Sequence, residues 1–85
     1  MSWVPVYGSS NVVEIRYHEP SRECFVKFTG GTVYCYENVP PEVWEELVHS
    51  QSKGRFVNIV LRRGYKYRKV SEAEKTVKEQ SGNES

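Results

Sequence analysis

The chain has 85 residues, and this length predicts one domain with a single modest hydrophobic core. Its 38% hydrophobic and 27% charged residues are typical of a globular protein, and its formal net charge of +1 points to no class of partner. No run approaches the roughly 20 apolar residues that span a bilayer, and the first residues do not resemble a signal peptide. We therefore expect a cytoplasmic protein without membrane contact, whose cysteines are reduced.

The first predicted strand lies at residues 12–17, where apolar and polar side chains alternate. This alternation places Val13, Ile15 and Tyr17 on one face of a half-buried strand. The turn that follows contains Pro20, which ends regular structure.

Two further strands are predicted at residues 24–28 and 32–36, which are rich in aromatic and β-branched side chains. A three-residue hairpin loop ending with Gly31 in the left-handed region gathers one coherent face, which a two-residue loop would disperse. That face consists of Cys24, Val26, Phe28, Tyr34 and Tyr36. In this register Cys24 and Cys35 point to opposite faces, so they cannot form a disulfide.

A helix is predicted from Pro41 to about Ser50, because proline suits a first helical position and glutamates follow it. Its amphipathic stripe consists of Val43, Trp44, Leu47 and Val48. We expect Trp44 to pack on the sheet face that carries Tyr34 and Tyr36.

Residues 52–63 fit either a helix or a strand, and we favour the helix. Ser52 suits its N-cap, and Gly64 lies where a helix often ends in a left-handed residue. Residues 65–70 alternate again and suit a short edge strand, with Tyr65, Tyr67 and Lys69 on one face. Lys66 and Arg68 would then lie on the other face.

Together these elements predict an α+β fold, in which one or two helices pack on one face of a three-stranded antiparallel β-meander. A short C-terminal edge strand can complete it. We place an N-terminal leader at residues 1–8, one domain at 9–70 and a polar tail at 71–85. The tail is expected to be disordered, with a frayed helix as the alternative. If exposed, Trp3 and Tyr7 of the leader would form an apolar patch.

Positive charge is concentrated in residues 53–70, here called the basic segment, which contains no acid. Its cations and interleaved tyrosines are candidate contacts to phosphates and unstacked bases. These candidates are Lys53, Arg55, Arg62, Arg63, Tyr65, Lys66, Tyr67, Arg68 and Lys69. The same cations could instead form a solvated face, balance the acidic helix or protect a sheet edge, and the tyrosines could belong to the core.

Several short patterns in the chain resemble the KTSC domain, a small prokaryotic and phage domain named from the C-terminus of a lysine tRNA synthetase. They are Ser9-Ser10-Asn11, Val26-x-Phe28, Gly31, Tyr34-x-Tyr36, Val39-Pro40, Ser52-Lys53-Gly54-Arg55-Phe56-x-Asn58, the pair Arg62-Arg63, and Tyr65. The resemblance covers about residues 9–67. It implies a compact α+β fold, supports a helix after Ser52, and hints at RNA through the synthetase.

Catalysis and metal binding find little support in the sequence. Ser52 and Lys53 lack the orienting group and oxyanion site of a working nucleophile, so Ser52 is interpreted as a cap and Gly54 as a close-packing or turn residue. Four side chains in unfamiliar spacing could supply zinc ligands: His18, Cys24, Cys35 and His49. We expect a non-enzymatic binding module without cofactor, which contacts RNA or single-stranded nucleic acid. The alternative is a protein–protein interaction module that acts through the leader or the acidic helix.

Overall fold

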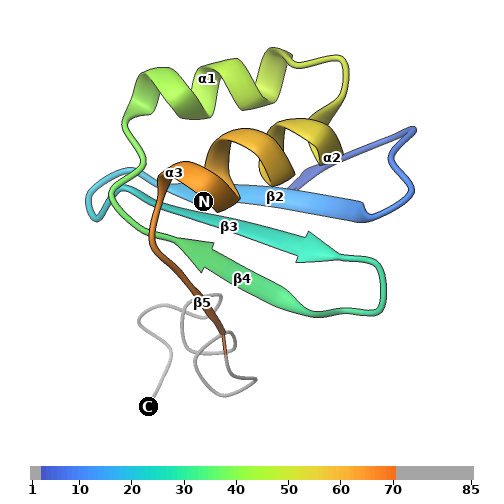
Figure 1. The fold of residues 1–85 in the computed structure, drawn as a ribbon, viewed down its shortest axis with the longest axis horizontal. Helices are drawn as coiled ribbons and strands as arrows, with labels where there is room; N and C mark the ends of the chain where they lie inside the picture. Colours follow the sequence, from blue (N-terminus) through green and yellow to red (C-terminus); the bar gives the residue numbers. More distant parts are fainter. Residues whose placement is uncertain (1–2, 71–85) are drawn as a thin grey trace.

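The computed structural model describes residues 3–70, which form a five-stranded antiparallel sheet with helices on one face (Figure 1). The strands are β1 (Val4–Pro5), β2 (Val12–His18), β3 (Glu23–Phe28), β4 (Val33–Tyr36) and β5 (Tyr67–Lys69), and they lie side by side in that order. Two helices are inserted between β4 and β5. The α+β class is confirmed, and the predicted three-stranded meander is extended by one strand at each edge.

The first helix, α1, spans Pro41–His49 and agrees with the prediction. The second helix runs from Lys53 to Gly64 in three parts: α2 (Lys53–Phe56), η1 (Val57–Leu61) and α3 (Arg62–Gly64). The helical interpretation of this region is therefore confirmed, and Ser52 occupies the N-cap position as predicted, but the expected capping features are absent at both ends. The Ser52 side chain makes no capping hydrogen bond. Gly64 takes no left-handed φ, because the chain leaves the helix through extended backbone at Tyr65.

The hairpin between β3 and β4 has the predicted register. Cys24 lies opposite Tyr36 and Val26 opposite Tyr34, while Gly31 has a φ of +97°. Since neighbouring residues in a strand point to opposite faces, Cys24 and Cys35 lie on different sides of the sheet. Both thiols are buried and free.

Strand β2 departs from simple alternation. Its pairing with β3 is irregular between Val12 and Glu14, so Val13 is the extra residue of a β-bulge. The bulge puts Val12 in the core with Ile15 and Tyr17, and leaves Val13 39% exposed. The predicted core position of Val13 is therefore wrong, because one inserted residue reverses the facing of its neighbour.

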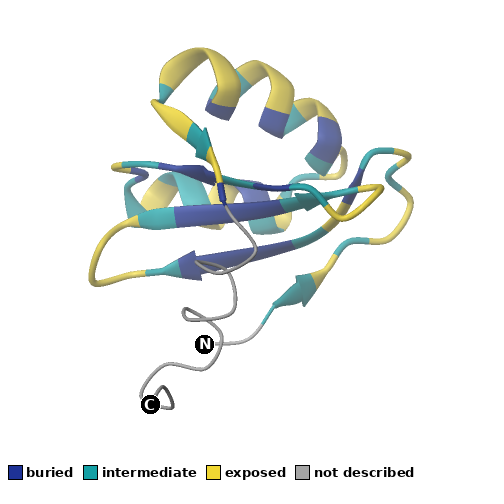
Figure 2. Cartoon of the chain, turned by 90° about the horizontal axis from the view of Figure 1, so that it is seen from below, coloured by how far each residue is buried: buried dark blue, intermediate teal, exposed yellow. Residues whose placement is uncertain are grey.

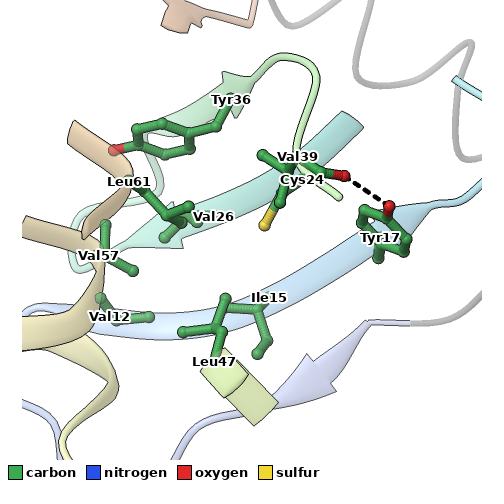
Figure 3. Packing of buried hydrophobic residues seen from close by; sticks show 10 residues of the cluster. All are labelled: Val12, Ile15, Tyr17, Cys24, Val26, Tyr36, Val39, Leu47, Val57 and Leu61. Atoms are coloured by element: carbon green, nitrogen blue, oxygen red, sulfur yellow. Dashed lines mark hydrogen bonds between the residues drawn. The ribbon is translucent and has the colours of Figure 1, made fainter. Parts of the chain in front are cut away.

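The main core lies between the sheet and the helices (Figure 3). The Tyr17 hydroxyl donates a hydrogen bond of 2.7 Å to the Val39 carbonyl oxygen within it. Trp44 stacks on Tyr17, with ring centroids 5.2 Å apart and planes 11° apart. It thus covers the expected face of the sheet but packs over β2 instead of over Tyr34 and Tyr36. Figure 2 shows buried residues gathered in the central strands and on the helix sides that face them.

A smaller cluster occupies the other face of the sheet. Strand β1 pairs with β2, and this pairing brings Trp3 against Phe25 and the buried Arg16. The Arg16 guanidinium lies 5.7 Å from the Trp3 ring centroid and 5.8 Å from that of Phe25. Trp3 is therefore part of the fold, whereas Tyr7 is 87% exposed. No helix in residues 3–70 is long and apolar enough to cross a membrane, and the predicted tail at 71–85 lies outside the described residues.

Candidate nucleic-acid interface

The second helix turns its apolar side to the sheet and its cations to solvent. Gly54, Val57 and Leu61 are buried at steps of three and four residues, which is helical spacing. Arg55 and Arg62 are both exposed, and each lines a cleft whose wall also contains Asn58. This outer side of the helix is the structural basis of the candidate interface.

A widened turn lies in the middle of that helix. The Arg62 backbone N–H donates to the carbonyl oxygen of Val57, five residues earlier, and this bond closes a π-helical turn. Single π turns within α-helices are frequent at functional sites. Here the turn spans the residues between the two exposed arginines.

The first of two clefts, called the polar cleft, has a volume of about 520 Å³. It lies between residues 7–11 and the start of the second helix, with Lys53, Arg55 and Asn58 in its wall. The Lys53 ammonium donates a hydrogen bond of 2.9 Å to the Ser50 carbonyl oxygen, and an ammonium has further N–H donors for a ligand. The polar cleft therefore offers hydroxyl, amide and cationic groups within one concavity.

A close contact between the helix and the loop shapes this cleft. The Ser9 Oγ hydrogen-bonds with Asn11 Oδ1 over 3.0 Å and accepts the Val12 N–H over 3.1 Å. A Cβ at Gly54 would overlap Asn11 Oδ1, so the position that this amide takes against the helix requires glycine at residue 54. The interpretation of Gly54 as a close-packing residue is confirmed, and the structure shows what it packs against.

The second cleft, called the aromatic cleft, has a volume of about 230 Å³ and lies between the second helix and strands β4 and β5. Its lining consists of Phe28, Tyr34, Tyr36, Asn58, Arg62 and Tyr67. Tyr67 meets Tyr34 edge to face at 5.7 Å between ring centroids, and Tyr36 at 5.4 Å with a tilt of 37°. Asn58 belongs to both clefts, which places them next to each other along the helix.

Burial is the main influence on the ionisation of Tyr36 in the aromatic cleft. Burial raises the pKa of Tyr36 to about 12, against a smaller opposing effect of the Arg62 charge. The Tyr36 phenol is therefore protonated at neutral pH and keeps a hydrogen-bond donor. A neutral aromatic wall beside one guanidinium suits a planar, polar ring better than it suits an anion alone.

The structure separates the remaining predicted contacts. Arg68 pairs with Cys35 in the sheet, on the face away from the helices, and its guanidinium contacts Glu23 at 3.3 Å and Glu37 at 3.5 Å. Tyr65 packs against the main core as a half-buried residue. Three further cations of the basic segment are exposed but line neither of the two clefts: Arg63, Lys66 and Lys69.

In the part of the chain that the structure describes, no ion pair joins α1 to the basic segment. Within residues 3–70, the ion pairs of that segment join Arg68 to glutamates of β3 and of the stretch after β4. Within α1, the Nδ1 atom of His49 lies 3.8 Å from a carboxylate oxygen of Glu45. In the same described part, no three His, Cys, Asp or Glu side chains come close enough to hold a metal ion.

Comparison with protein families gives a match to the KTSC domain over residues 8–67. The chain belongs to the KTSC domain family. In the crystal structure of a KTSC domain protein from Yersinia pestis the same fold recurs, with a TM-score of 0.74 and 30% identity. That likeness covers 82% of this chain and 97% of the other.

Relatives of this KTSC domain occur alone and within larger proteins. A protein from Tsukamurella paurometabola is 39% identical over 54 residues, covering 62% of this chain and 81% of the relative. A lysine–tRNA ligase from Nostoc punctiforme is 31% identical over 62 residues, which is 73% of this chain and 11% of the ligase. The domain is thus a small part of that enzyme.

Several lining residues of this KTSC domain were not predicted as ligand contacts. Phe28, Tyr34 and Tyr36 were correctly placed on one sheet face, but that face was expected to be covered by helix. Asn58 lies three residues after Arg55 and four before Arg62, a spacing that could have placed it between them on one side of a helix. This spacing could have predicted Asn58 as a contact only once the segment was known to be helical, and the sequence also fitted a strand there.

Proposed function

We propose that this KTSC domain is a non-catalytic module that binds single-stranded nucleic acid, with RNA as the preferred form, through the outer side of its second helix. One observation carries the proposal. Arg55 and Arg62 are exposed on that side, each in the wall of a cleft, and Asn58 joins the two clefts. Cations next to aromatic rings supply both elements that a flexible strand needs, namely phosphate contacts and stacking surfaces.

Electrostatics support this surface as a polyanion site. Arg68 is the one cation of the basic segment that forms an ion pair within residues 3–70. The other cations keep their charge available to a ligand, and the segment contains no acid that would repel a phosphate. Each phosphate contact is favourable because it releases counterions condensed on the strand.

The preference for RNA is based on the relatives of this domain. Related domains form part of the lysine–tRNA ligases of Nostoc punctiforme and Trichormus variabilis, and the name of these enzymes includes an RNA, tRNA. Single strands are favoured over duplexes because bases can reach an aromatic cleft only when they are unstacked.

Fluorescence anisotropy with labelled single-stranded RNA, single-stranded DNA and duplex DNA tests the proposal. Affinity should rank in that order and should fall between about 50 and 200 mM salt, with a logarithmic slope of roughly 0.7 per phosphate contact. Arg62→Gln should weaken binding and reduce the slope by about one contact. Arg68→Gln is the matched control, because it removes the same charge from the other face of the sheet.

Two results would overturn the proposal. One is the absence of binding to all three nucleic acids at low salt, and this would leave a protein partner as the hypothesis to pursue. The other is an equal loss of affinity in Arg62→Gln and Arg68→Gln, which would show that net charge and not the cleft surface drives binding. Lys66→Glu tests the contribution of an exposed cation outside the clefts, and it should weaken binding less than Arg62→Glu.

A further inference from the structure

We propose that the aromatic cleft is a pocket for one unstacked base of the bound strand, with Tyr67 as the stacking ring and Asn58 as the group that contacts the base edge. This inference rests on the proposed function and assigns a specific subsite to it. The size of the cleft, the state of its rings, its polar groups and its position beside the polar cleft support it.

The size of the aromatic cleft restricts its occupant. Pockets for drug-sized ligands hold roughly 300–1,000 Å³. The aromatic cleft, at about 230 Å³, lies below that range. It therefore suits a single planar ring system better than a complete dinucleotide or a folded peptide.

The rings around the cleft leave a stacking surface available. Tyr67 is 44% exposed although it contacts two other tyrosines. Both contacts are edge-on or tilted, with interplanar angles of 84° to Tyr34 and 37° to Tyr36, and neither covers the ring in parallel. A base stacked on an exposed aromatic ring is stabilised whatever its identity, because every base has a π face.

Polar groups belong to the same lining as these rings. The exposed Asn58 amide presents a donor beside an acceptor, a combination that complements the edge of a base. The Arg62 guanidinium lies in the same lining, where it can contact the neighbouring phosphate or stack on the base. These groups distinguish the pocket from a plain apolar groove that would take a protein side chain.

The position of the cleft gives the strand a path. Asn58 belongs to the polar cleft as well, and the wall of that cleft carries Lys53 and Arg55. A strand with one base in the aromatic cleft can therefore continue along the helix with its phosphates toward these two cations. Base pocket and phosphate track therefore meet at Asn58 on the second helix.

The test compares a labelled single-stranded oligonucleotide with the same oligonucleotide carrying abasic sites, which has the same backbone charge. We expect the wild type to prefer the base-containing strand by roughly 5- to 100-fold, as stacking of one base predicts. Tyr67→Leu should bring this ratio close to one, and Tyr67→Phe should keep it. Asn58→Ala, at an exposed position that needs no core repacking, should lower the ratio without lowering the thermal unfolding temperature.

The outcomes separate this inference from the proposed function. No binding of either strand would remove the proposed function itself. Equal binding of both strands by the wild type would keep strand binding and overturn the base pocket. A ratio that survives in Tyr67→Leu and in Asn58→Ala would also overturn the pocket. Displacement of the strand by N-acetylphenylalanine amide but not by free nucleosides would assign the cleft to a protein side chain instead.

Discussion

Replacing Gly54 with alanine tests the contact that joins the N-terminal loop to the second helix. In an open helix this change would stabilise the protein by about 1 kcal/mol, because alanine has the higher helix propensity. Here the new Cβ would overlap Asn11 Oδ1 and stand 3.0 Å from Ser9 Oγ. Asn11 cannot turn away freely, since its Oδ1 and the Ser9 hydroxyl share a hydrogen bond of 3.0 Å.

The expected sign is therefore reversed. Overpacking a closely packed site costs about 1–3 kcal/mol, either as strain or as loss of that hydrogen bond. After the propensity gain is subtracted, the free energy of unfolding should fall by about 1 kcal/mol for Gly54→Ala. For a domain of this size such a change lowers Tm by about 4–8 °C. Thermal unfolding followed by circular dichroism measures it directly.

Gly64→Ala provides the matched control, because Gly64 is also helical but has no left-handed φ, and a Cβ at this position would meet no atom within 4 Å. Its Tm should equal or exceed that of the wild type. A Gly54→Ala protein with a Tm at or above the wild-type value would refute the reasoning. An Asn11→Ala background should also relieve the overlap. In that background Gly54→Ala should lower the free energy of unfolding by a smaller amount.

Tyr17→Phe removes the donor to the Val39 carbonyl and should lower the free energy of unfolding in urea by about 1–2 kcal/mol, while an unchanged value would show no net contribution. Burial raises the pKa of the Cys35 thiol to about 12 and also raises the pKa of Cys24. Native protein at about pH 8 should therefore react with iodoacetamide much more slowly than urea-unfolded protein, and equal rates would contradict the buried state. In the unfolded chain these thiols have a pKa near 9.0. The two buried thiols therefore contribute their full stabilisation below about pH 9, and this stabilisation is lost as the pH rises through the folded-state pKa. The urea midpoint should accordingly fall above about pH 9. Trp3→Ala removes a ring that two cations approach at 5.1 and 5.7 Å and should cost about 1 kcal/mol, measured by urea unfolding; an unaltered midpoint would mean that β1 docks without it.

The parts of the fold that depend on local periodicity were predictable. The β3–β4 register followed from parity, because side chains of a strand alternate and one register gathers Cys24, Val26 and Phe28 with their partners. The bulge at Val13 was not predictable, since one extra residue leaves no mark on composition. Pairing of Val4–Pro5 with β2 was also missed, because two residues carry no periodic signal.

The candidate site was also predictable only in part. The concentration of cations between residues 53 and 70 is a property of the sequence, and the family could be recognised from its motifs. The sequence does not show which of these cations share a surface, because a continuous run of charged residues does not specify where each side chain points. Helical geometry places Arg62 in the same cleft as Tyr67, whereas the alternation of β5 places Arg68 on the other face of the sheet, where it contacts Glu23.

The sequence alone thus determined an α+β domain with a defined hairpin register and one basic segment, and it favoured a second helix, because these depend on the order of side chains along the chain. Only the tertiary structure decided that Asn58 connects a polar cleft to an aromatic one, and that Gly54 admits the N-terminal loop. Clefts form where segments distant in sequence pack side by side, and that packing depends on contacts that no local pattern specifies.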